Sequence, residues 1–93
     1  MGVTEVLVKF RDGFTVVYPP CETGIVAYAR AAAWIGRFPA AKTREFSERR
    51  DVLLHDQTTG ELTRSKAERT IMVIVIEIQE SASPEVRDLA ALV

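Results

Sequence analysis

The run TIMVIVIEI at residues 70–78 decides the fold, because it is the most apolar strand-like stretch in a chain of 93 residues. Successive side chains of a strand point to opposite faces. Both faces of this run are apolar, with Met72, Ile74, Ile76 and Ile78 on one side and Ile71, Val73 and Val75 on the other. Burying each such side chain is worth about 1.5–3 kcal/mol, so both faces need cover.

The chain length fits one domain spanning residues 1–93. With 47% hydrophobic and 27% charged residues, the composition excludes a disordered or fibrous chain. No apolar run approaches the ~20 residues that cross a bilayer, and the first residues carry no secretion or myristoylation pattern. The single cysteine excludes an internal disulfide. These features predict a soluble protein, with the reducing cytoplasm as its simplest location.

The stretch VTEVLVKF-RDG-FTVVYPP at residues 3–20 predicts a hairpin. A three-residue loop with Gly13 in the left-handed conformation pairs Phe10 with Phe14 and places the apolar residues of both strands on one face. A two-residue Asp12-Gly13 loop pairs polar with apolar residues, so the longer loop is favoured. Pro19 and Pro20 are expected to end the second strand.

A helix is expected from Glu22 or Thr23 to Phe38, where Pro39 stops it. At 100° per residue one stripe is apolar and is predicted to be buried, and it consists of Ile25, Tyr28, Ala32 and Ile35 with Ala29 and Gly36 beside it. The opposite, outward face then carries Thr23, Arg30, Trp34 and Arg37.

The second half of the chain is predicted in four parts. Residues 42–50 fit an exposed strand and a polar helix equally well. Residues 52–63 predict a second hairpin, with Gly60 closing its turn, and residues 65–68 form a polar connection. The long strand follows from Arg69 to Gln79. A short helix then begins with Ser83 as its cap and Pro84 at its first position.

The resulting prediction is an α+β domain with a mainly antiparallel sheet of about five strands. The order along the chain is strand, strand, helix, strand, strand, strand, helix. The main helix covers one face of the sheet. For the other face there are two candidates, the C-terminal helix or a second copy of the chain, and a homodimer is favoured.

The sequence predicts no catalytic residue, no cofactor and no metal site. Cys21 and His55 make the only thiol and imidazole combination, and nothing in their spacing brings them together. Cys21 is interpreted as a small residue at a helix start. No phosphate-binding loop, dinucleotide fingerprint, nucleophile elbow or zinc spacing is present. An enzyme is therefore the less favoured class.

Two surfaces are predicted to bind partners. The first is the helix face with Arg30, Trp34 and Arg37, where Trp flanked by Arg is typical of protein interfaces; the alternative is that Trp34 packs against Phe38 or the segment after Pro39. The second is a basic segment that adjoins this helix and consists of Arg37, Lys42, Arg44, Arg49 and Arg50 with Phe46 among them.

These surfaces predict a small non-enzymatic module that binds another protein as an inhibitor, adaptor or accessory subunit, of the kind that phages and mobile elements encode. The first alternative is a nucleic-acid-binding accessory protein that uses the Lys42–Arg50 segment. A net charge of −1 and two glutamates within the segment argue against it. The second alternative is a small-molecule enzyme with its site at a dimer interface.

Overall fold

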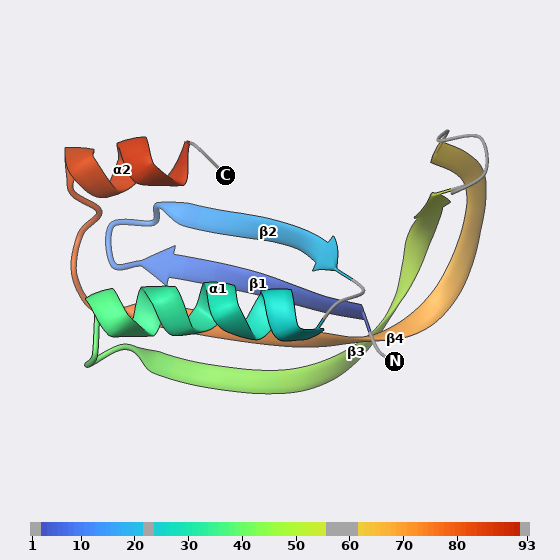
Figure 1. Ribbon diagram of the computed structural model, residues 1–93, viewed down its shortest axis with the longest axis horizontal. Coiled ribbons are helices and arrows are strands. Elements are labelled where there is room, and N and C mark those ends of the chain that lie inside the picture. Colours follow the sequence, from blue (N-terminus) through green and yellow to red (C-terminus); the bar gives the residue numbers. More distant parts are fainter. Residues whose placement is uncertain (1–2, 22–23, 56–61, 92–93) are drawn as a thin grey trace.

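The computed structural model describes residues 3–21, 24–55 and 62–91, without the side chains of residues 19–21, 52–55 and 62–67. The elements in order are β1 (Val3–Phe10), β2 (Thr15–Cys21), α1 (Gly24–Arg37), β3 (Lys42–His55), β4 (Leu62–Ile78) and α2 (Pro84–Ala90). Within these residues the strands form one four-stranded sheet in the order β2-β1-β4-β3 (Figure 1).

The α+β class is confirmed, but the prediction of about five mainly antiparallel strands is met only roughly. The sheet is mixed, because its two central strands, β1 and β4, run parallel. The outer pairs, β1 with β2 and β3 with β4, are antiparallel. Parallel strands need a long crossover connection, and here β2, α1 and β3 all lie between β1 and β4 in the chain.

The first hairpin has the predicted three-residue loop. The Phe10 N–H donates to the Phe14 carbonyl over 2.8 Å, and Gly13 adopts a φ of 92°. The strands then pair Val8 with Val16 and Val6 with Tyr18, as expected. Local apolar alternation and one glycine therefore set the register of this hairpin.

The predicted end of the second strand at Pro19 is wrong, because β2 continues through both prolines to Cys21, which pairs with Thr4. Cys21 thus ends a strand instead of starting a helix. In the described part of the chain β2 is an edge strand, and an edge strand tolerates prolines because its outward side has no ladder to complete.

Residues 42–50, for which strand and helix were both open, form the first part of β3. His55 pairs with Leu62 across the second hairpin, whose predicted turn at residues 56–61 lies outside the described residues. The polar connection predicted at residues 65–68 is wrong, because β4 runs unbroken from Leu62 to Ile78. Polar side chains do not interrupt a strand when its partner continues beside it, and β3 pairs with β4 through this region.

One core lies between the sheet and both helices. The alternation predicted for β4 holds, since Ile74, Ile76 and Ile78 lie in this core. α2 contributes Val86 to the same core, so the candidate role of the C-terminal helix as cover for the opposite face is wrong. Its start is as predicted, with the Ser83 hydroxyl accepting from the Val86 N–H over 3.2 Å.

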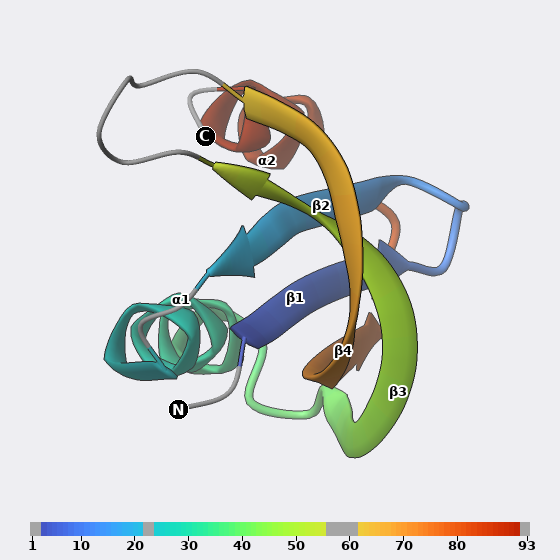
Figure 2. The same ribbon diagram turned by 90° about the vertical axis from the view of Figure 1, so that its right-hand side faces the viewer.

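The opposite face of the sheet is also buried within a single chain. Its centre is a second apolar cluster of Val3, Ile71, Val73 and Val75, each at most 6% exposed. The β3–β4 ribbon bends out of the sheet at the end where β1 begins (Figures 1 and 2). Arg50 of β3 reaches over β4, which lies between β3 and β1, to pair with Glu5. Both faces are therefore shielded, and the reason given for a homodimer no longer applies to this cluster.

Asp12 ties the first loop to the segment that enters α2. Its carboxylate accepts hydrogen bonds from the Phe14 N–H over 3.1 Å, from the Ala82 N–H over 3.1 Å and from the Arg87 guanidinium over 2.8 Å. The Phe14 hydrogen bond, aided by those of Arg87 and Ala82, holds the pKa of Asp12 below its ordinary value of 3.8, although burial opposes the shift.

This lowered pKa predicts an acid-dependent contribution to stability. A carboxyl with a depressed folded-state pKa stabilises the fold above its unfolded pKa, and the contribution is lost as pH falls through the folded pKa. We expect Asp12→Asn to unfold at lower urea than the wild type at pH 7, and the two midpoints to converge in acid, below the folded-state pKa of Asp12. An equal gap between the midpoints at both pH values would show that the ionised carboxylate is not the stabilising group.

Candidate functional site

The outer face of α1 is apolar, contrary to the predicted orientation of this helix. Ile25 is 82% exposed, Tyr28 50% and Ile35 37%, although these residues were predicted to be buried. Ala29, Ala32 and Gly36 of the same stripe are exposed as well. The residues that face the sheet are Ala27, Ala31 and Trp34.

Trp34 explains the orientation of α1. Its indole N–H donates to the Tyr18 hydroxyl over 2.8 Å, and its ring lies edge-on to Phe10 at 5.8 Å and stacked on Phe38 at 6.3 Å between centroids. The largest side chain of the helix is thereby buried with its one polar atom satisfied. Of the two alternatives for Trp34, packing is the one observed, and the expected outward position of this residue is wrong.

The exposed stripe is unusual for a surface helix. Between Gly24 and Gly36 the only charged residue is Arg30, so the helix is apolar on nearly its whole circumference. Helices of this kind are typically buried on all sides. A contiguous apolar patch on a small protein is typical of an interaction site. We define the outer face of α1 as Ile25, Tyr28, Ala29, Ala32, Ile35 and Gly36.

The predicted basic segment does not form one cationic surface. From the pairing with β4, Arg44, Phe46 and Arg50 lie on the face of the second apolar cluster, whereas Arg49 lies on the opposite face. Phe46 is 41% exposed. Arg37 belongs to the last turn of α1, so the residues of the segment are spread over three surfaces.

The three arginines of β3 are each paired with carboxylates. Arg44 lies 3.2 Å from Glu77, Arg49 lies 2.9 Å from Glu68, and Arg50 pairs with Glu5 and, at 2.7 Å, with Glu48. The hydrogen bonds to Glu5 and Glu48 raise the pKa of Arg50 above its ordinary value. Pairing of this kind reduces the cationic potential that a phosphate backbone needs.

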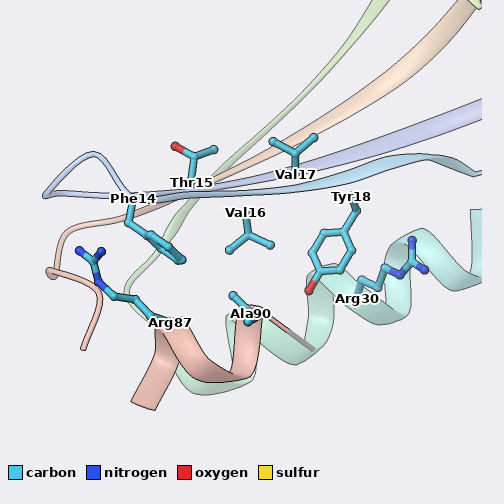
Figure 3. Close-up of a pocket in the computed structure, with 9 residues that line it drawn as sticks. Phe14, Thr15, Val16, Val17, Tyr18, Arg30, Arg87 and Ala90 are labelled. Atoms are coloured by element: carbon cyan, nitrogen blue, oxygen red, sulfur yellow. The ribbon is translucent and has the colours of Figure 1, made fainter. Parts of the chain in front are cut away.

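In the described part of the chain, Arg30, Arg37 and Lys42 have no ion pair. Arg37 and Lys42 flank the connection between α1 and β3. Arg30 lies instead beside a hollow of about 560 Å³ between β2, α1 and α2 (Figure 3). Its guanidinium carbon sits 4.9 Å from the centre of the Tyr18 ring.

This hollow was not predicted, because its walls come from three segments whose relative positions no local pattern reveals. Arg87 of α2 lines its other end, with its guanidinium carbon 4.7 Å from the centre of the Phe14 ring. Val16 of β2 and Ala90 of α2 line it from opposite sides, and their side chains face each other in Figure 3.

Other candidate chemistry is sparse in the residues that can be described. Their His, Cys, Asp and Glu side chains include no group of three or more arranged to hold a metal ion. Cys21 and His55 end β2 and β3, and their side chains lie outside the description. Neither described helix has the length and hydropathy needed to cross a membrane. No family model, curated protein or solved structure matches the chain.

Proposed function

We propose that this chain is a small protein-binding module, acting as an adaptor, inhibitor or accessory subunit, and that its contact surface is the outer face of α1. The observation that carries the proposal is the exposure of Ile25, Tyr28 and Ile35 on a helix whose other face is already buried. Covering large apolar side chains is favourable by about 25 cal/mol per Å². A partner with a complementary apolar surface supplies that cover.

The small residues of the outer face indicate which kind of partner surface could pack closely against it. Ala29, Ala32 and Gly36 lie at i, i+3 and i+7 of this face, so much of it carries only short side chains beside Ile25 and Ile35. Close helix approach is favoured where such small residues line the contact. The proposed partner is therefore a protein that presents an apolar helix to this face.

Arg37 and Lys42 do not belong to this surface, because Arg37 lines a hollow with Tyr18, Trp34 and Leu89, and Lys42 pairs in strand register with Glu77 on the face of the second apolar cluster. Both are exposed and have no ion pair in the described part of the chain. The predicted basic segment therefore adds no cation to the outer face of α1, and the arginines of β3 are paired with carboxylates.

Localised cross-linking tests the proposal. A photo-activated amino acid placed at Ile25 is expected to capture a protein partner in lysate of the native host, whereas the same group at Thr15 is not. Thr15 is exposed and points away from the helices (Figure 3). Equal capture at both positions would contradict a site on α1.

A matched pair of substitutions then measures the contribution of the apolar face. Ile25→Ser should weaken binding of the captured partner roughly 30-fold, because Ile25 is 82% exposed on this face and a large apolar contact buried by a partner is worth about 2 kcal/mol. Val17→Ser is the control, since Val17 is 56% exposed on the other side of the sheet, and it should change affinity less than about twofold. The proposal fails if the two variants bind alike.

A further inference from the structure

The hollow between β2 and the two helices has the features of a small-molecule site. Its volume of about 560 Å³ lies within the range of ligand pockets, which is roughly 300–1,000 Å³. Val16, Tyr18 and Ala90 form an apolar lining, and Arg30 and Arg87 stand at opposite ends of it (Figure 3). Ligand pockets are typically apolar with a few polar groups that orient the ligand.

The two arginines differ in how many of their N–H groups already donate hydrogen bonds within the protein. Arg87 donates to the Asp12 carboxylate over 2.8 Å and to the Ala82 carbonyl over 3.2 Å, so its charge and part of its hydrogen-bonding capacity are used. Arg30 is partly buried and has neither an ion pair nor a hydrogen bond to any described residue. Its guanidinium lies over the Tyr18 ring, an arrangement that leaves the N–H groups at its edge free to donate.

Tyr18 brings a second unused donor to the same end of the hollow. The residue is only 7% exposed, and its hydroxyl oxygen accepts the indole N–H of Trp34. A phenol hydroxyl also donates one hydrogen bond. No acceptor for that proton is present among the described residues. A buried donor of this kind gains a partner when an acceptor enters the hollow.

We propose that this hollow binds a small amphipathic carboxylate. The apolar body of the ligand contacts Val16 and Ala90, and its carboxylate accepts hydrogen bonds from the Arg30 guanidinium and the Tyr18 hydroxyl. A single negative charge on the ligand matches Arg30, because Arg87, the other arginine that lines the hollow, is already paired with Asp12. This site is independent of the protein-binding face, because it faces β2 and α2, whereas Ile25 and Ile35 point away from the core.

Trp34 provides the readout, since it is the only tryptophan in the chain and is hydrogen-bonded to Tyr18. Titration with decanoate up to about 1 mM should give a saturable change in Trp34 fluorescence, and calorimetry should give the same Kd. Decanol has the same apolar body without the charge. It should bind at least tenfold more weakly, because hydrogen bonds to charged groups are the strong ones.

Two substitutions locate the carboxylate. Arg30→Met keeps the length and apolar stem of the side chain and should weaken decanoate binding at least tenfold while leaving decanol binding unchanged. Tyr18→Phe keeps the ring and should weaken decanoate binding severalfold, measured by calorimetry because the hydrogen bond to Trp34 is also lost. Lys42→Met is the matched control, since it removes an unpaired cation from β3, and should bind decanoate as the wild type does.

Three results would overturn the proposal. One is the absence of saturable binding of decanoate to the wild type. Another is equal affinity for decanoate and decanol, which would show simple apolar partition. The last is an equal loss of decanoate affinity in Arg30→Met and Lys42→Met, which would show a general charge effect in place of a specific site.

Discussion

Replacing Trp34 with alanine is expected to lower the free energy of unfolding by about 3–5 kcal/mol. The substitution removes the largest side chain of the helix-side core, which packs against Phe10 and Phe38, and leaves the Tyr18 hydroxyl without its donor. A domain of this size is stabilised by about 5–14 kcal/mol in total, so the variant should lose a large share of its stability. Urea unfolding followed by circular dichroism measures the change.

The conservative variant Trp34→Phe separates the two contributions. It keeps an aromatic ring in the core but removes the indole N–H, so it should cost less than the alanine variant by about 1–3 kcal/mol. A value for Trp34→Ala within about 1 kcal/mol of the wild type would mean that Trp34 is not a core residue and would also remove the explanation given for the orientation of α1.

Replacing Ile71 with alanine is expected to cost about 2–5 kcal/mol, which is the usual range for a fully buried isoleucine. Ile71 is 0% exposed at the centre of the second apolar cluster, and that cluster is buried within one chain. The loss should therefore be the same at micromolar and at tenfold higher protein concentration, because no association is needed to cover the residue.

The control for this experiment is Val17→Ala on the same face of the sheet, which is exposed and should change stability by less than about 0.5 kcal/mol. The explanation would be contradicted if the free energy of unfolding of the wild type rises with protein concentration and the destabilisation by Ile71→Ala also depends on it. That result would show that a second copy of the chain covers this face. Sedimentation at the same concentrations reports the oligomeric state directly.

The elements that the sequence predicted well depend on residues close together in the chain. The hairpin register follows from the alternation around Gly13, and the start of α2 follows from Ser83 and Pro84. The alternation of Ile74 and Val75 to opposite faces of β4 is also a property of the strand itself. Such features need no knowledge of the rest of the fold.

The face of α1 that meets the sheet could not be predicted in this way. The helix has two apolar faces, one with Ile25 and Ile35 and one with Ala27, Ala31 and Trp34, and periodicity favours the first. The second face is buried because Trp34 finds two partners on the sheet. The Tyr18 hydroxyl accepts the hydrogen bond from its indole N–H, and the Phe10 ring packs against its ring. These partners are 16 and 24 positions away in the chain.

The candidate site changed for the same reason. Trp34 was expected at the surface but lies in the core. The arginines of β3 form ion pairs with Glu5, Glu68 and Glu77, which are distant from them in the sequence. Arg30 kept a place at the surface but faces a hollow built by β2 and α2. The apolar residues expected inside became the surface on which the proposed function rests.

Hairpin geometry, helix capping and the two-sided apolar character of residues 70–78 were readable from local order, because turns, caps and strand alternation are set by neighbours within a few positions. The parallel pairing of β1 with β4, the orientation of α1 and the hollow beside Arg30 arose only when the whole chain packed. Each of these depends on which distant apolar surfaces meet, and the hydrophobic effect that drives their meeting has no direction of its own.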